Sequence, residues 1–180
     1  MNTKFLLRLI RHLKVKTFEK GEILINSESR REDFFFIRKG LVRSYHFNEK
    51  AEEITFQLFS ESNFFGNAHA IFLNKPSKFT YEAIERTKVY TLYFDDFRKI
   101  LAGNAESIDF EKSFIFRSTM SQILNRMESF VLLTPEERYK KYLQDHSKII
   151  HRVPDKYIAS VLGITPVSLS RIRGRLAAKN

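Results

Sequence analysis

The hydrophobic pattern divides the chain near residue 94. Between residues 14 and 94, short runs rich in Phe, Tyr, Ile and Val partly alternate with polar residues and are separated by turn residues. This spacing is typical of antiparallel strands in a sandwich or barrel. The runs KFTYEAIE and KVYTLYF are expected to pair with each other across Arg86 and Thr87. The other expected strand runs are VKTFEKGEILI, DFFFIRKGLVRSYHF and EEITFQLF.

Helical periodicity begins after Asp95 and Asp96, which suit a helix N-terminus, and it continues to the end of the chain. A long helix is expected over residues 106–133, and a short one over residues 3–13. The long helix carries one apolar stripe with heptad spacing, which is the candidate dimer interface and is formed by Phe116, Met120, Ile123, Met127 and Phe130. A second stripe beside it contains Phe110, Phe114, Leu124 and Val131. Either one stripe covers the chain's own strands and the other a partner helix, or both are buried within one subunit.

The last part of the chain, VPDKYIASVLGITPVSLSRIRGRL, predicts two short helices with a tight turn between them. The first is expected over residues 154–162, and Gly163 suits the left-handed conformation that ends a helix. Thr165 is expected to cap a second helix over residues 165–176, with Pro166 at its first position.

The two faces of that second helix differ sharply. Leu169, Ile172 and Leu176 recur at helical spacing and define a buried face. The opposite face carries Val167, Ser168, Arg171, Gly174 and Arg175. This layout is typical of a helix-turn-helix that offers its second helix to a major groove. The alternative is a helical hairpin with a purely structural role.

Charge and composition narrow the candidate partners. Lys and Arg outnumber Asp and Glu by 31 to 21, which gives a formal net charge of +10 and favours an anionic partner. Residues 134–180 hold ten basic and four acidic residues, so the excess is concentrated at the end with the two short helices. Thr134 and Pro135 mark a break before this basic end. We expect a domain boundary there, with parts 1–133 and 134–180.

Several functional classes find no support in the sequence. The chain has no cysteine, which excludes disulfides, thiolate zinc sites, iron–sulfur clusters and cysteine nucleophiles. The five histidines are scattered, and no nucleophile elbow, phosphate-binding glycine loop or HExxH motif occurs. The N-terminal apolar residues are interrupted by basic ones, which argues against a signal peptide or a membrane span. We therefore expect a non-enzymatic, soluble and cytoplasmic protein with no metal and no membrane partner.

The order of these parts resembles the Crp/Fnr family of bacterial transcription regulators along essentially the whole chain. FFFIRKGLVRSY is similar to that family's strand–Gly–strand element, and NFFGNAHAIFLNKPSKFTYEAIERT to its phosphate-cassette region. VPDKYIASVLGITPVSLSRIRGRL is similar to its helix-turn-helix and is the most specific of the three matches. The resemblance implies a cyclic-nucleotide-binding-like barrel or jelly roll, a homodimer and a palindromic DNA operator. It also makes RNA polymerase a candidate partner.

Two positions depart from the family members that bind a cyclic nucleotide. Those members hold the ribose with a Gly-Glu pair and the cyclic phosphate with an Arg before a small hydroxyl residue. Here Asn67 follows Gly66, and Ser77-Lys78 stands where the Arg is expected. Losing a bidentate guanidinium–phosphate contact makes cyclic AMP a poor ligand. The candidate effector-pocket residues are Phe65, Gly66, Asn67, Ser77 and Lys78.

Other effectors have even less support. A haem would need an axial ligand such as His46 or His69, and a lone histidine in such a barrel is usually structural. We therefore assign no cofactor, and the effector stays open.

The second short helix also departs from the family, because Pro166-Val167 stands where many members have an Arg-Glu pair. The later Arg of that motif is kept as Arg171, for which the resemblance implies a bidentate contact to guanine. Val167 is suited to a thymine methyl group. The candidate DNA-contacting residues are Thr165, Val167, Ser168, Ser170, Arg171 and Arg175.

Together these patterns predict an α+β fold. An N-terminal antiparallel β-barrel or jelly roll is followed by a long dimerisation helix at about 106–133 and a C-terminal helix-turn-helix. The predicted function is that of a homodimeric DNA-binding regulator. The alternative is a small-ligand-binding or interaction module with the same barrel and no specific DNA target.

Overall fold

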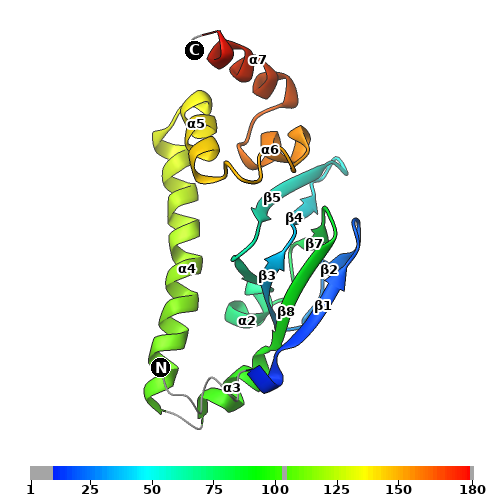
Figure 1. The fold of residues 1–180 in the computed structure, drawn as a ribbon, viewed down its shortest axis with the longest axis vertical. Helices are drawn as coiled ribbons and strands as arrows, with labels where there is room; N and C mark the ends of the chain where they lie inside the picture. Colours follow the sequence, from blue (N-terminus) through cyan, green and yellow to red (C-terminus); the bar gives the residue numbers. More distant parts are fainter. Residues whose placement is uncertain (1–9, 103–104, 179–180) are drawn as a thin grey trace.

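The computed structural model describes residues 10–102 and 105–178 of the chain, excluding the side chains of 101–116, 118 and 119 (Figure 1). The strands are β1 (Lys14–Phe18), β2 (Ile23–Ile25), β3 (Asp33–Lys39), β4 (Val42–Phe47), β5 (Glu53–Phe59), β6 (Phe64–Gly66), β7 (Thr80–Ala83) and β8 (Thr87–Tyr93). The helices are α2 (Ala68–Leu73), α3 (Phe94–Ala102), α4 (Ala105–Leu132), α5 (Pro135–Asp145), α6 (Asp155–Val161) and α7 (Pro166–Ala177). The helix expected over 3–13 lies mostly outside the described residues.

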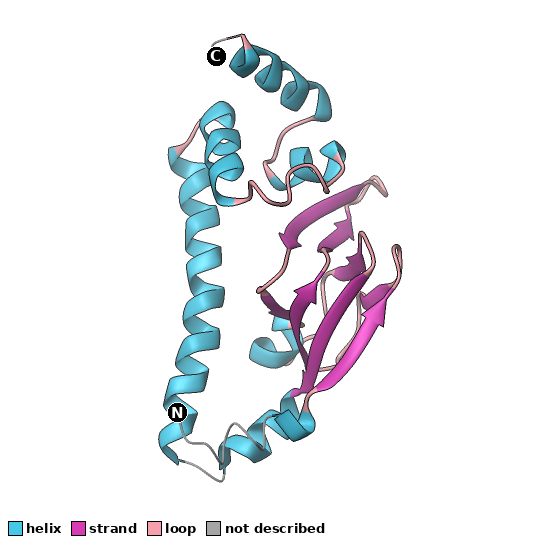
Figure 2. Cartoon of the chain, viewed as in Figure 1, coloured by secondary structure: helices cyan, strands magenta, loops and turns pink. Residues whose placement is uncertain are grey.

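Strands β1–β8 form two four-stranded antiparallel sheets, which we call the β-sandwich (Figure 2). The strand orders are β1-β8-β3-β6 and β2-β7-β4-β5, which confirms the expected antiparallel architecture. The expected pairing of β7 with β8 is wrong: β7 pairs with β2 and β4, whereas β8 pairs with β1 and β3. The residues between them carry the chain from one sheet to the other, and a corner of this kind has the same turn signals as a hairpin.

The core of the β-sandwich lies between the two sheets. Strand β3 alternates buried and half-buried residues along Asp33–Ile37, as a strand with one face on the core should. Both sheets contribute to one buried cluster, formed by Ile25, Phe35, Ile37, Val42, Phe59, Phe65, Tyr81 and Val89. Burying side chains of this size stabilises the fold by about 1.5–3 kcal/mol each.

Gly40 makes the tight connection from β3 to β4 possible. Its φ is 115°, and a Cβ there would lie 2.4 Å from Oγ1 of Thr87. Only glycine tolerates both constraints. Thr87 Oγ1 in turn donates a hydrogen bond to the Leu41 carbonyl and accepts one from the Leu41 N–H.

Two short elements between β5 and β7 have no counterpart in the sequence prediction. Strand β6 has three residues, and α2 has six. Elements this short leave no readable hydrophobic period. The side chain of Asn67 caps α2 by accepting from the N–H of Ala70.

The long helix α4 runs beside the β-sandwich, and α5 to α7 gather at its far end (Figure 1). The predicted bounds of 106–133 for this helix agree with α4 to within a residue. Thr134 caps α5 in a capping box with Glu137, and Pro135 is its first residue. The expected helix start at Asp95 falls one residue late, because α3 begins at Phe94.

Helices α5–α7 do not form a separate core. Their buried residues share one cluster with Leu41, Leu58 and Ile84 of the β-sandwich. Ser160 of α6 also donates a hydrogen bond to the carbonyl of Thr55 on β5, at 3.1 Å. The short helices are therefore anchored on one end of the β-sandwich. Within the described ranges, no helix is both long and apolar enough to cross a bilayer.

Candidate functional site: the basic helix and two cavities

Helix α7 presents the two faces expected from its sequence. Thr165 caps it, accepting from the N–H of Ser168 at 3.1 Å. Leu169 and Ile172 are buried, with exposed fractions of 0% and 3%, and Leu176 packs against the same cluster. The opposite face is exposed, including Val167, Ser170, Arg171, Gly174 and Arg175. Ser168 is half-buried beside the cap.

The three arginines of α7 differ in their surroundings. Arg173 donates to Asp155 at 2.6 Å and to the Tyr139 hydroxyl at 2.8 Å, so it ties α7 to α6 and α5. Arg175 pairs with Glu136 of α5 at 3.3 Å. Among the described residues, nothing pairs with the exposed Arg171. Arg171 is therefore the guanidinium of this face that is directly available to an external anion.

The turn between α6 and α7 is closely packed. Gly163 has a φ of 66°, as expected for a residue that ends a helix in the left-handed conformation. A Cβ at this position would lie 2.6 Å from Cε1 of Phe130 on α4. Phe130, a predicted dimer contact, thus packs against its own chain on this side.

The outward face of α4 combines members of both predicted stripes. Ile123 lines a cavity described below, whereas the side chain of Phe116 lies outside the described residues. Four exposed apolar residues lie along one face of the helix, next to the half-exposed Ile123 and at spacings of four, three and four: Met120, Leu124, Met127 and Val131. Their exposed fractions, from 36% to 80%, leave a continuous apolar stripe uncovered in the single chain.

A first cavity, the sandwich cavity, lies between the two sheets, α2 and α4, with a volume of about 240 Å³. Among the described residues, no Arg, Lys, Asp or Glu lines it. Besides the Tyr81 hydroxyl, the polar side chains of its described wall are Ser44, Gln57, His69 and Gln122. Eight aromatic side chains form most of the wall: Phe34, Phe56, Phe59, Phe64, Phe65, Phe72, Phe79 and Tyr81.

Only two of the five candidate effector residues, Phe65 and Gly66, line this cavity. Asn67 is fully buried, and its amide donates to the carbonyls of Ser29 and Arg31 while it caps α2. The Ser77 hydroxyl donates to the Phe79 carbonyl, and Lys78 is exposed. These three residues thus hold the loops in place or face solvent. Burial and two nearby lysines lower the pKa of His69, which also lines the cavity.

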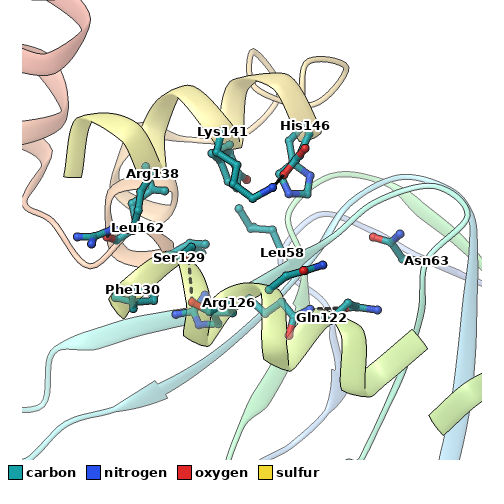
Figure 3. A pocket seen from close by; sticks show the side chains of 15 residues that line it. Leu58, Asn63, Gln122, Arg126, Ser129, Phe130, Arg138, Lys141, His146 and Leu162 are labelled. Atoms are coloured by element: carbon teal, nitrogen blue, oxygen red, sulfur yellow. Dashed lines mark hydrogen bonds and ion pairs between the residues drawn. The ribbon is translucent and has the colours of Figure 1, made fainter. Parts of the chain in front are cut away.

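A second cavity, the interhelix cavity, has a volume of about 470 Å³ and lies between α4, α5, the end of α6 and strand β5 (Figure 3). Gln57 and Gln122 line both cavities and are joined by a hydrogen bond of 2.6 Å, so they form the wall between them. The interhelix cavity contains Arg126, Arg138 and Lys141. The sequence does not mark these cations as site residues, because basic residues are common on amphipathic helices and usually face solvent.

Two arginines add ion pairs to the joint between α6 and the β-sandwich. Arg43 of β4 has a side chain only 3% exposed, pairs with Glu53 and Glu82, and stacks on Tyr157 of α6. Arg152, just before α6, pairs with Glu61 and Glu85. The hydrogen bonds to these two carboxylates raise the pKa of Arg152.

Glu61 shows how tightly that second pair is held. Burial alone would raise the pKa of Glu61. The hydrogen bonds from Arg152 and from the N–H of Gly40 outweigh it and lower the pKa to about 2. Glu61 therefore stays ionised at any pH near neutrality, and the pair persists.

The chain was compared with known protein families and with curated proteins. Residues 15–104 match the family described as cyclic nucleotide-binding domain, which is half of the chain. A search of curated proteins found no match.

Solved structures resemble the whole chain. The c-di-GMP responsive global regulator CLP of Xanthomonas campestris is 12% identical with a TM-score of 0.75, covering 99% of this chain and 93% of its own. A CooA mutant of Carboxydothermus hydrogenoformans is 15% identical with a TM-score of 0.72, and the match covers 95% of this chain and 79% of that protein. A protein of Eubacterium rectale, described as a transcriptional regulator of the Crp/Fnr family, is 16% identical with a TM-score of 0.74. The match covers 99% of this chain and 85% of that protein. The chain belongs to the cyclic nucleotide-binding domain family and has the fold of the Crp/Fnr transcription regulators.

Proposed function

We propose that the chain is a homodimeric DNA-binding transcription regulator of the Crp/Fnr type. In this proposal residues 1–133 form a sensor with a dimerisation helix, and residues 134–180 form a helix-turn-helix unit. The observation that carries the proposal is the exposed face of α7. It combines Arg171, which has no partner among the described residues, with small residues on a helix whose other face buries Leu169 and Ile172. Such a helix can enter the major groove while the rest of the protein keeps its fold.

Each residue of this face has a proposed role. Arg171 makes a bidentate contact to guanine, and Val167, which is 61% exposed, meets a thymine methyl group. Thr165, Ser168, Ser170 and Arg175 position the helix on phosphates. For Arg175 this requires exchanging Glu136 for a phosphate, which is feasible because an exposed ion pair contributes little stability.

The proposed dimer forms through the apolar stripe of α4. Its members, Met120, Leu124, Met127 and Val131, have the spacing of a two-stranded coiled coil. Pairing two such helices buries side chains that a single chain leaves in water. It also relates the two α7 helices by a twofold axis, which is the symmetry of a palindromic operator.

The sandwich cavity does not favour a cyclic nucleotide. The phosphate of cyclic AMP would enter an aromatic cavity with no cation in its described wall. Burying that charge without a partner costs several kcal/mol. We propose that cyclic AMP does not act through this cavity, and calorimetric titration giving a micromolar dissociation constant would refute this.

The function is tested by measuring binding to fluorescent duplex DNA at several salt concentrations. Wild-type protein should bind with an affinity that falls steeply as salt rises, because each phosphate contact releases counterions. Operators selected in vitro should form a palindrome. Repeating the selection with Arg171→Ala should relax one base pair in each half-site, at about 1–3 kcal/mol of lost discrimination. Lys148→Ala, which removes an exposed charge outside α7, serves as the control.

The possible outcomes separate the readings. A uniform loss on all sequences in Arg171→Ala would make this residue a phosphate contact only. Salt-independent or undetectable binding to every duplex would contradict DNA recognition. It would favour a ligand-binding or interaction module built on the same fold.

A further inference from the structure

The interhelix cavity holds an arginine that has no counter-ion among the described residues. Arg126 on α4 is partly buried, and burial lowers its pKa. Its guanidinium lies over the rings of Phe56 and Phe130, at 4.8 and 5.1 Å from their centres. Among the described residues, no carboxylate pairs with this guanidinium and no carbonyl accepts from it. Desolvating a charge without a partner is costly, so its presence in a cavity wall needs a reason.

The other charges of the cavity do not neutralise Arg126. Asp145 is the cavity's one described carboxylate, and it pairs with Lys141 on the same helix, at 3.1 Å. Arg138 donates to the carbonyls of Leu133 and Leu162, so it too has no acid partner among the described residues. Three cations therefore face one carboxylate around a space of about 470 Å³.

The rest of the wall suits a small polar molecule. Figure 3 shows α4 with Gln122, Arg126 and Ser129 on one side of the space, and α5 with Lys141 and His146 on the other. Amide and hydroxyl side chains supply further donors and acceptors, and Leu58 and Leu162 supply apolar contact. Tyr142, also in the wall, has a buried hydroxyl that finds no hydrogen-bond partner in the described part of the chain. The volume falls within the range of about 300–1,000 Å³ that is typical of small-molecule sites.

We propose that the interhelix cavity binds a small multivalent anion, with a carboxylate or phosphate group seated on the guanidinium of Arg126. This site is separate from the sandwich cavity, from which the Gln57–Gln122 hydrogen bond divides it. A bound anion contacts α4, α5, α6 and β5 at once, so it links the sensor part to the helices that carry α7. The inference itself does not depend on DNA binding, and its test contains no DNA.

The test is calorimetric titration of the full chain with two probe anions, citrate for carboxylates and inorganic pyrophosphate for phosphates. The buffer contains neither anion and a fixed, near-physiological concentration of sodium chloride. At least one probe should bind with a stoichiometry of one per chain. Arg126→Gln should weaken this binding at least about tenfold, since a charge-assisted bidentate contact is lost. Arg126→Lys should give an intermediate loss, because it keeps the charge but not the fork of donors.

Lys78→Gln is the matched control, since it removes an exposed positive charge beside the sandwich cavity. It should leave the dissociation constant within about twofold of the wild-type value. Thermal unfolding without ligand checks that each variant is folded. The proposal is overturned if neither probe binds the wild-type chain. It is equally overturned if Arg126→Gln binds as tightly as wild type, or if Lys78→Gln loses as much affinity as Arg126→Gln.

Discussion

Arg43 and Arg126 both hold a guanidinium group away from bulk water, but in opposite surroundings. Arg43 lies where α6 meets the β-sandwich, pairs with Glu53 at 2.8 Å and Glu82 at 2.6 Å, and stacks on Tyr157 at 4.1 Å. Arg126 lies in the interhelix cavity and contacts two phenylalanine rings, with no described carboxylate in reach. The first region is electrostatically complete, and the second becomes complete only when an anion enters.

This difference predicts changes of opposite sign. Removing one partner from a buried ion pair leaves the other charge desolvated and destabilises the protein. Removing a desolvated charge that has no partner relieves a cost that the free protein already carries. Replacing Arg43 at the α6 joint should therefore lower the free energy of unfolding. Replacing Arg126 in the cavity should leave it unchanged or raise it.

The largest effect is expected for Arg43→Met. This change strands Glu82, whose side chain is only 17% exposed, and removes the stacking on Tyr157. The free energy of unfolding should fall by about 3 kcal/mol, measured by urea denaturation. The double variant with Glu82→Gln should lose less than the two single losses together. A loss below about 1 kcal/mol in Arg43→Met would mean that the joint contributes little.

The next largest loss of stability is expected in the turn between α6 and α7. Gly163→Ala forces a left-handed residue to carry a Cβ that would meet Phe130 at 2.6 Å. We expect a loss of about 1–2 kcal/mol in thermal or urea unfolding. Gly174→Ala in α7 is the matched control: nothing lies within 4 Å of its added Cβ, so better helix propensity should stabilise the protein by up to about 1 kcal/mol. Equal effects of the two changes would contradict this packing.

The pH dependence of the joint should be smaller still. Glu61 has a pKa of about 2 in the folded state, below its usual value of 4.5, so its ion pair stabilises the protein fully above the unfolded-state pKa. That contribution is lost as the pH falls from about 5 through 2. Because the pair is partly exposed, we expect about 1 kcal/mol after allowing for solvent screening. Urea unfolding of wild type should weaken more over this range than that of Glu61→Gln; parallel curves would argue against the pair.

The sequence predicted local structure better than it predicted these two regions. The bounds of α4, the Thr165 cap and the burial of Leu169 and Ile172 follow from periodicity and capping, which depend on residues within a few positions. The sheet partners of β7 and β8 do not, because a sheet corner and a hairpin have similar turn residues. The partners of Arg43 are also distant in the chain, on β5 and β7.

The candidate effector residues illustrate the same limit. The family motif predicts Asn67 and Ser77 as effector contacts, but in the structure both side chains hold backbone groups. Nothing in the sequence marks Arg126 as a site residue, because an arginine on an amphipathic helix usually faces solvent. What distinguishes it is that no acid of the described residues lies near it in three dimensions, and no spacing along the chain reveals that.

The smallest expected effect tests the cavity side of the comparison directly. Without ligand, Arg126→Met should raise the free energy of unfolding by about 0.5 kcal/mol, since the desolvated charge is removed and a thioether can pack on the same phenylalanine rings. Arg138→Met is the matched control in the same wall. It loses the hydrogen bonds to the carbonyls of Leu133 and Leu162, at 2.9 and 3.2 Å, and should destabilise the protein. Urea denaturation of both variants in a buffer free of multivalent anions makes the comparison. If Arg126→Met proves as destabilising as Arg138→Met, the guanidinium of Arg126 is a structural group, and the contrast with Arg43 disappears.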